Sequence, residues 1–274
     1  MSIKFYSKYR IKNLKLSNRI FLAPMEEVND IAFRLLCKKA GAGLTYTGLI
    51  HPLSQQLFYL QDKPAVQLFC NSKKGIAEFI KKNDKQVSLW DFNLGCPVFK
   101  AKKEGYGAYL TDLKTIEEIL KTIKSSTKKP VTIKIRKSEI AFKLLELAEK
   151  YCDAIAVHPR TKEQGYSGKP DVEFALQIKK KSKIPVIYSG NANGKNYKDL
   201  LEKFDFVMVG RASIGHPEIF AELTGNKKFK RSVKDYLKLA VQHKLSHNQI
   251  KFQVMNFTKG LRNSRKLRVE INRC

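Results

Sequence analysis

The chain has 274 residues, of which 43% are hydrophobic, and this is enough for one large barrel or two ordinary domains. Its 53 lysines and arginines outnumber its 25 acidic residues, and the net charge of +28 favours a polyanionic partner, most simply nucleic acid. The sequence has no apolar run long enough to span a membrane and no apolar stretch near its start, which argues against an integral membrane protein and against a secretory signal.

Short apolar runs alternate with helical patterns from about residue 19 to about residue 224. The predicted strands are Ile20–Pro24, Leu44–Thr47, Ala65–Phe69, Val87–Phe92, Val131–Ile135, Ala154–His158, Val186–Tyr188 and Phe206–Val209. The predicted helices between them include Ile31–Lys39, Lys74–Lys82, Ile116–Ser125, Ile140–Lys150, Val172–Lys180 and Tyr197–Lys203. Eight strand–helix alternations predict an α/β fold of the (β/α)8 TIM-barrel type rather than a doubly wound sheet. No GxGxxG motif follows the first strand, so the dinucleotide-binding fingerprint is absent.

The region after the last predicted strand has a different pattern. Val233–His247 and Ile250–Leu261 are predicted helices without strands, and Ile250, Val254, Phe257 and Leu261 share one face of the second. We place a boundary near Gly225, which gives a barrel domain at 1–224 and a small all-α domain at 225–274. The second domain has 14 basic and 2 acidic residues, a net charge of +12. Because these charges are interspersed with apolar residues, we expect a folded basic module and not a disordered arm.

The cysteines indicate a reducing environment and one candidate reactive group. The five are scattered without a CxxC pair, which argues against a zinc site or a disulfide framework and for the cytoplasm; they are Cys37, Cys70, Cys96, Cys152 and Cys274. Cys96 lies in Asn93-Leu94-Gly95-Cys96-Pro97, between a predicted strand and a basic, glycine-containing loop at 100–107. A lone cysteine is more often a small buried hydrophobic side chain. A thiol is also mostly protonated at pH 7, so Cys96 can serve as a proton donor as readily as a nucleophile.

Polar and charged residues follow most of the predicted strands. In a (β/α)8 barrel the active site lies at these carboxyl ends. The residues are Pro24-Met25-Glu26, Gln67, Asn93 with Cys96, Lys134 with Arg136, His158 with Arg160, Ser189-Gly190-Asn191, and Gly210-Arg211. Few of them belong in a purely structural strand end, so they predict an active site.

Some of these positions indicate particular contacts. Gly190 and Gly210 close the last two strands, where barrels often bind a phosphate through backbone N–H groups, and Arg211 would add a charge-assisted contact. Gln67 is a single polar side chain in an apolar strand, which suits hydrogen bonding to a planar heterocycle. Lys134 either points inward to an anionic partner or faces water near the strand end, and the pattern leaves both orientations open.

Several short elements occur in a recognisable order and spacing. The most specific is Asn93-Leu94-Gly95-Cys96-Pro97, and the weaker ones are Leu22-Ala23-Pro24-Met25-Glu26, Val66-Gln67-Leu68, Val131–Arg136, His158-Pro159-Arg160-Thr161, Ile184–Ile187, Val207–Ala212, Gly215-His216-Pro217 and Phe257-Thr258-Lys259-Gly260. Together they resemble the tRNA-dihydrouridine synthase family over essentially the whole chain. The chain departs from that family at Glu27, where the family usually has Gly, and in its shorter helical domain.

The resemblance implies an FMN-bearing barrel and a helical domain that together hold a tRNA. It assigns flavin binding to Pro24, Met25, Glu26, Gln67, Lys134, His158, Gly190, Asn191, Gly210 and Arg211, with Lys134 beside the pyrimidine edge of the ring. It assigns substrate binding to Asn93, Lys100, Lys102, Arg136, Arg160, Arg262, Arg265 and Arg268. Cys96 would be the general acid, and NADPH or NADH the electron donor. We expect no resident metal and no obligate protein partner.

The implied activity is reduction of the C5=C6 bond of specific uridines in tRNA to 5,6-dihydrouridine. Hydride would pass from N5 of the reduced flavin to C6, and Cys96 would give its proton to C5. One alternative is a flavin barrel that acts on a small pyrimidine, which leaves the basic C-terminal region unexplained. Another is a non-catalytic RNA-binding protein on a decayed barrel, and the intact set of Cys96, Lys134, His158 and Arg211 argues against it.

Overall fold

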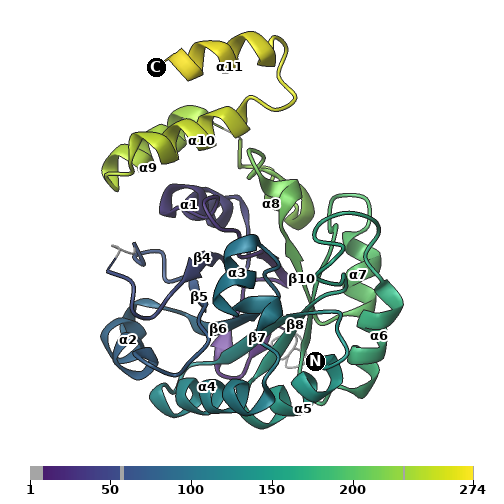
Figure 1. Cartoon of the computed structure of the whole chain (residues 1–274). Coiled ribbons are helices and arrows are strands. Elements are labelled where there is room, and N and C mark those ends of the chain that lie inside the picture. The colour runs from purple at the N-terminus through teal and green to yellow at the C-terminus, as the bar shows by residue number, and fades with distance from the viewer. Residues whose placement is uncertain (1–8, 56–58, 231, 274) are drawn as a thin grey trace.

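The computed structural model describes residues 9–55, 59–230 and 232–273. Its centre is an eight-stranded parallel sheet in the order β3-β10-β9-β8-β7-β6-β5-β4 (Figure 1). The strands are β3 (Ile20–Leu22), β4 (Tyr46–Ile50), β5 (Ala65–Leu68), β6 (Leu89–Leu94), β7 (Val131–Arg136), β8 (Ala154–His158), β9 (Val186–Ser189) and β10 (Phe206–Val209). A single parallel bridge between Phe21 and Leu44 joins β3 to the segment before β4 and closes the barrel. The prediction of a (β/α)8 barrel is therefore confirmed.

Amphipathic helices cover the outside of the barrel. They are α1 (Ile31–Ala40), α2 (Ile76–Asn83), α4 (Leu113–Ser126), α5 (Ala141–Tyr151), α6 (Val172–Lys181), α7 (Tyr197–Lys203) and α8 (Ile219–Thr224). In α4, the predicted apolar face of Ile116, Ile119, Leu120 and Ile123 is fully buried. This helix begins where the side chain of Asp112 accepts a hydrogen bond from a backbone N–H in the first turn. The pattern and the cap therefore both specify its position.

The structure differs from the sequence-based elements in several places. The second barrel strand runs over Tyr46–Ile50, two residues later than predicted, because pairing with β5 is irregular between Tyr46 and Leu49, around Gly48. The loop expected at 100–107 begins with a short helix, α3 (Phe99–Glu104), which ends at Gly105 with φ 69°. Two strands not predicted, β1 (Arg10–Ile11) and β2 (Leu14–Lys15), form an antiparallel hairpin.

The barrel interior forms its own apolar cluster. Alternate strand residues fill it, including Phe21, Tyr46, Ile187 and Met208, while the opposite faces of the strands pack on the helices. The N-terminal hairpin closes one end, where Ile11 is fully buried against this cluster. The other end, formed by the carboxyl ends of the strands, contains the polar residues of the candidate site.

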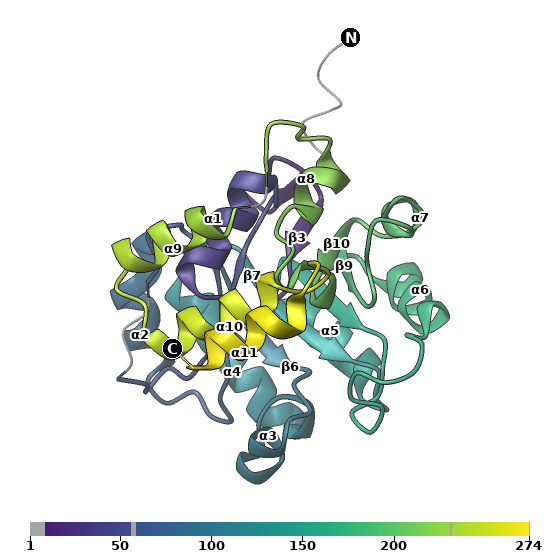
Figure 2. The ribbon, with the colours of Figure 1, turned by 90° about the horizontal axis from the view of Figure 1, so that it is seen from above.

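Three helices follow the barrel, where two were predicted. They are α9 (Val233–Gln242), α10 (His247–Phe257) and α11 (Ser264–Arg273). The first predicted helix ends early, at Gln242, just before Lys244 with φ 51°. A capping box of Ser246 and Gln249 then begins α10. Figures 1 and 2 show these helices together beyond α1 and α8, and α9 packs on α1. Within the described part of the chain, each helix is too short or too polar to cross a lipid bilayer.

Candidate active site

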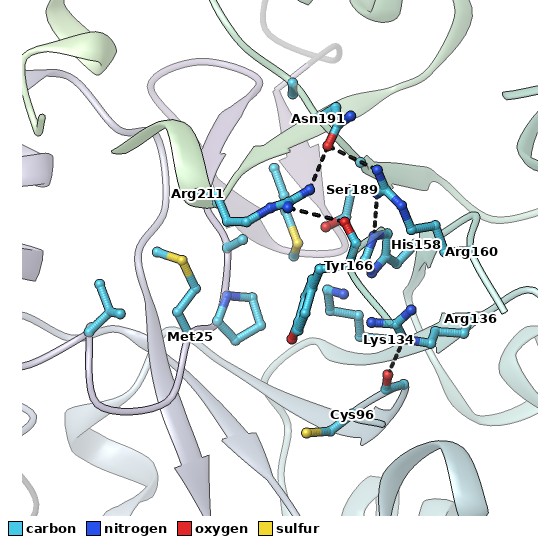
Figure 3. A pocket seen from close by; sticks show the side chains of 18 of the residues that line it. Met25, Cys96, Lys134, Arg136, His158, Arg160, Tyr166, Ser189, Asn191 and Arg211 are labelled. Atoms are coloured by element: carbon cyan, nitrogen blue, oxygen red, sulfur yellow. Dashed lines mark hydrogen bonds between the residues drawn. The ribbon is translucent and has the colours of Figure 1, made fainter. Parts of the chain in front are cut away.

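A cavity of about 810 Å³ opens at the carboxyl ends of the barrel strands (Figure 3). Most of the residues predicted for the site line it. These are Pro24, Met25, Glu26, Asn93, Cys96, Lys134, Arg136, His158, Arg160, Gly190, Asn191, Gly210 and Arg211. Figure 3 shows Cys96 at one end, Asn191 at the other, and Lys134 between them.

The remaining predicted residues lie elsewhere. Gln67 is fully buried and does not line the cavity, because its amide group is bonded to two neighbouring side chains within the barrel. Lys100 and Lys102 lie on α3 and are exposed. Of the C-terminal arginines, Arg262 and Arg265 are exposed, and Arg268 is half-buried because its Nε donates to Thr258 Oγ1 at 2.9 Å.

The loop that carries Cys96 is held from below by a chain of buried polar groups. The backbone N–H groups of Gly95 and Cys96 donate to Asn93 Oδ1 at 3.0 and 2.9 Å. Asn93 Nδ2 donates to Gln67 Oε1 at 2.7 Å, and Gln67 Nε2 donates to Asp91 Oδ2 at 2.6 Å. Burial raises the pKa of Asp91 to about 6. Gln67 therefore supports the thiol loop, and its role in flavin binding stays a prediction.

The thiol of Cys96 is partly buried in the cavity wall. Burial raises its pKa, and the nearby carboxylate of Glu26 acts in the same direction, whereas Lys134 and Arg136 lower it. The loop also passes close to Gly107, where a Cβ atom would lie 2.7 Å from the carbonyl oxygen of Cys96. With φ 57° at Gly107, only glycine fits there without strain. The thiol is thus protonated at neutral pH and fixed in position.

Lys134 projects from β7 into the cavity wall, so the inward orientation is the correct one of the two left open. Burial and the neighbouring Arg136 together lower the pKa of its ammonium to about 8, whereas Asp91 and Cys96 oppose the shift. Among the described residues, no hydrogen bond to its Nζ is present. A ligand with a negative charge at this point would stabilise the charged form.

The far end of the cavity joins two arginines, a histidine and an amide. Asn191 Oδ1 accepts from Arg160 Nη2 at 3.1 Å and from Arg211 Nη2 at 2.7 Å. Arg160 Nη1 lies 3.0 Å from His158 Nε2. Burial and the surrounding cations lower the pKa of His158 to about 2, so its ring is neutral. Asn191 has φ 50°, a left-handed conformation that asparagine tolerates better than most residues.

Arg160 is fully buried, although it was expected at the barrel mouth as a phosphate contact. Its other hydrogen bonds go to the carbonyl oxygens of Ser167 and Gly168 at 3.0 and 2.7 Å. These bonds use most of its donors within the protein, so Arg160 fixes the loop after β8, and its role as a phosphate contact stays a prediction. Arg136 is similar, with bonds to the carbonyl oxygens of Gly95, Thr161 and Gly165 at 2.5, 3.0 and 2.7 Å.

Sequence reasoning missed Tyr166, which lies at the centre of the cavity mouth in Figure 3. The guanidinium groups of Arg136 and Arg211 lie 5.3 and 5.5 Å from the centre of its ring. Its position between Gly165 and Gly168, both with positive φ, is the signal that a tight functional loop contains it. Tyr166 is about half exposed, so its ring is available to a ligand.

Cationic side chains outnumber anionic ones in the cavity wall. Lys134, Arg136, Arg160 and Arg211 line the cavity, against the single carboxyl group of Glu26. The hydrogen bonds that these arginines donate to described residues go to carbonyl, amide and imidazole acceptors, and not to a carboxylate. The fold and the site together define a (β/α)8-barrel enzyme whose cavity is lined by an excess of cationic side chains and by a thiol.

Comparison with known proteins identifies the family. A family model described as "Dihydrouridine synthase (Dus)" matches residues 21–272, and the chain therefore belongs to the dihydrouridine synthase family of oxidoreductases. A "Probable tRNA-dihydrouridine synthase" of Rickettsia bellii is 34% identical over 85% of this chain and 80% of its own length. One from Aquifex aeolicus is 29% identical over 92% of this chain and 90% of its own length. A solved structure of a morphinone reductase variant has the same fold, with a TM-score of 0.56 at 14% identity over 82% of this chain and 92% of that one.

Proposed function

We propose that the protein is a tRNA-dihydrouridine synthase, which uses FMN to reduce the C5=C6 bond of specific uridines in tRNA to 5,6-dihydrouridine. The observation that carries this proposal is a protonated thiol, Cys96, in the wall of a cation-rich cavity. Membership of the family and the names of the relatives from Rickettsia bellii and Aquifex aeolicus support it.

The cavity residues fit FMN in size and charge. The cavity has a volume of about 810 Å³, which is within the usual range for cofactor sites. Arg211, Asn191 and the backbone of Gly190 and Gly210 would hold the phosphate, where cations and N–H groups gather. Lys134 would lie beside the electron-rich edge of the ring. The negative charge at this edge would raise the pKa of Lys134 toward its ordinary value. Met25 and its apolar neighbours would exclude water from the ring.

When bound, FMN supplies the hydride that C6 of the uracil accepts, and NADPH or NADH replenishes it. The protein's own residues supply the proton and the alignment. Cys96 donates its proton to C5, where negative charge develops, because burial keeps the thiol protonated until that moment. Asn93 holds the loop so that the thiol stays in the cavity wall. His158 remains neutral and serves as a hydrogen-bonding group rather than as an acid.

The RNA must present an unstacked uridine to the cavity, which is easiest in a loop. Lys100 and Lys102 on α3 and Arg262 and Arg265 beyond α10 are exposed and would contact phosphates. The net charge of +12 from residue 225 onward supports a tRNA-binding role for a domain at 225–274, next to a catalytic domain at 1–224. We place this activity in the cytoplasm.

The first experiment separates the cofactor from the acid. Denatured wild-type protein should release FMN, and Cys96→Ala should bind FMN and tRNA normally but lose about 10²–10⁴-fold in turnover, because it removes a proton donor and leaves the phosphate-binding groups intact. Release of FAD, or of no flavin after reconstitution, would refute the cofactor. Near-normal single-turnover reduction by Cys96→Ala would mean that another group is the acid.

The second experiment tests the RNA surface. Charge reversal at Arg262 and Arg265 should lower tRNA affinity and reduce the log–log salt slope by roughly 0.7–0.9 for each phosphate that the variant no longer binds. Charge reversal at Lys81 and Lys85, which are equally exposed on and after α2, is the matched control with the same change in net charge. Equal slopes for both variants would show that the arginines are only solvated and would favour a small pyrimidine as the substrate.

A further inference from the structure

The loop after β3, residues 24–30, is one wall of the cavity and has an unfavourable backbone conformation. Met25, Glu26 and Val28 line the cavity from this loop. Glu27 has φ 62°, and the N–H group of Val28 donates to the carbonyl oxygen of Glu26 at 2.7 Å, which makes a tight three-residue turn. A non-glycine residue in this conformation persists only when its surroundings hold it there.

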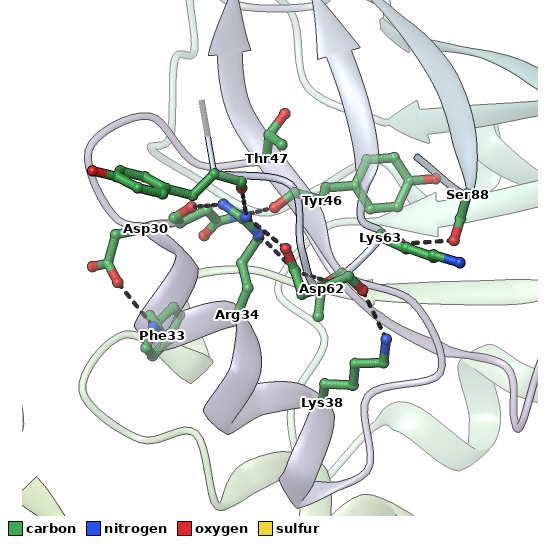
Figure 4. Close-up of polar contacts among 12 residues, drawn as sticks. Asp30, Phe33, Arg34, Lys38, Tyr46, Thr47, Asp62, Lys63 and Ser88 are labelled. Atoms are coloured by element: carbon green, nitrogen blue, oxygen red, sulfur yellow. Dashed lines mark hydrogen bonds and ion pairs between the residues drawn. The ribbon is translucent and has the colours of Figure 1, made fainter. Parts of the chain in front are cut away.

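Two side chains, Asn29 of the loop itself and Arg34 of α1, fix the end of this loop. Asn29 Nδ2 donates to the carbonyl oxygens of Ala23 and Tyr46, both at 2.8 Å. Arg34 Nη1 donates to the carbonyl oxygen of Asn29 at 2.7 Å, and the guanidinium is fixed by a buried ion pair with Asp62 at 2.8 Å (Figure 4). These contacts fix residue 29, and the N–H group of Asn29 donates across the loop to the carbonyl oxygen of Met25 at 3.2 Å. The carbonyl oxygen of Val28 is not among these acceptors.

The contact to the middle comes from α10. Gln253 is fully buried, and its Nε2 donates to the carbonyl oxygen of Val28 and to Asp30 Oδ2, the latter at 2.9 Å. The reverse orientation of the amide would place Oε1 against two acceptors, so the donor assignment follows from chemistry. Tyr236 of α9 donates to the same Asp30 oxygen at 3.3 Å.

The same helix also contacts the loop after β10, the strand that pairs with β3. Gly215, after β10, has φ 71°, and a Cβ atom there would lie 2.1 Å from the carbonyl oxygen of Asn256 on α10. That loop also carries cavity residues, among them Arg211 and Ile214. Helix α10 therefore packs on the loops that follow the neighbouring strands β3 and β10.

We propose that Gln253 is a positioning residue: it holds Val28 so that the strained loop at 24–30 keeps Met25 and Glu26 in the cavity wall. The idea rests on the proposed function, because the ligand that this wall contacts is taken to be FMN. Gln253 itself is inaccessible to RNA, since its side chain is fully buried. Its removal should therefore affect the cavity and leave tRNA affinity unchanged.

The test uses Gln253→Met, which keeps the volume and removes the donor. Its matched control is Asn256→Met, another buried amide on α10 whose side chain bonds to Phe252 of its own helix. Gln253→Met should bind FMN about 2- to 10-fold more weakly, the usual worth of one hydrogen bond, and should lower kcat without raising KM for tRNA. In flavin-free protein, amide hydrogen exchange over residues 24–30 should be faster in Gln253→Met than in Asn256→Met.

A double variant separates the loop contact from helix docking. Asp30→Asn with Gln253→Glu exchanges donor and acceptor, so the pair between α10 and residue 30 reforms, while Val28 is left without its donor. We expect its thermal stability to recover and its FMN affinity and fast exchange to remain like those of Gln253→Met. Wild-type FMN affinity and exchange in either Gln253 variant would overturn the proposal. If wild-type protein binds no flavin, the proposed function fails, and the exchange measurement still decides the role of Gln253.

Discussion

Replacement of Lys134 by Met should stabilise the flavin-free protein while it impairs the enzyme. The ammonium of Lys134 lies in the cavity wall, where burial and Arg136 disfavour its charge. Met has a similar volume and no charge, so it removes the cost of charging a partly desolvated group. A residue that lowers stability in the empty site is expected where a charged ligand is to be bound.

The magnitude follows from the pKa. The decrease in the pKa of Lys134 from 10.5 to about 8 corresponds to about 3 kcal/mol of lost stability near pH 7, at 1.36 kcal/mol per pKa unit. Because water in the cavity screens the charge, we expect an effect of roughly 2 kcal/mol. The cost is fully present below pH 8, because both the folded and the unfolded chains are then protonated. It disappears as the pH rises from 8 to 10.5, where the unfolded chain alone still carries the proton.

Urea unfolding of flavin-free wild type and Lys134→Met at pH 7 and pH 9 checks this reasoning. The variant should be more stable at pH 7 by roughly 2 kcal/mol, and its advantage should shrink by about 1 kcal/mol at pH 9. Saturating FMN should reverse the order, because wild type alone gains the charge-assisted hydrogen bond from Lys134 to the edge of the ring. A variant that is less stable than wild type at pH 7, or an advantage independent of pH, would show that Lys134 has a structural role.

Three further predictions concern stability. Asn93→Leu should cost roughly 2–4 kcal/mol, because two backbone N–H groups of the thiol loop lose their acceptor, and chemical denaturation will measure the loss. Glu27→Gly should raise the unfolding free energy by about 0.5–1 kcal/mol; a lower midpoint in a thermal melt would contradict the interpretation of φ 62° as strain. Arg34→Met should destabilise by roughly 3–5 kcal/mol, since it leaves the buried carboxylate of Asp62 unpaired, with partial recovery in the Arg34→Met, Asp62→Leu double variant.

The barrel could be predicted because its strands are short apolar runs and its outer helices have regular apolar faces. All eight predicted strands overlap observed ones, and most boundaries agree within two residues. The exceptions have local causes: Gly48 interrupts the pattern in β4, and the lysines of α3 conceal a helix that buries only Ala101. The C-terminal helices were harder, because α10 buries the polar side chains of Gln253 and Asn256 beside Phe257.

The residues of the site were easier to find than their contacts. Position at a strand end is visible in the sequence, so Cys96, Lys134 and Arg211 could be selected from the pattern. Which donors are already used within the protein depends on contacts between segments far apart in the chain. Gln67 and Arg160 were therefore expected to face a ligand or the mouth, although both are fully buried in hydrogen-bonded networks.

The N-terminal hairpin has a consequence for the movement of protons inside the barrel. Because Ile11 and its neighbours seal one end, solvent approaches the buried carboxyl group of Asp91 from the opposite end, where Gln67 and Asn93 lie between it and the cavity. A ligand in the cavity covers that route. We therefore expect the carboxyl group of Asp91 to exchange its proton with solvent more slowly when a ligand fills the cavity.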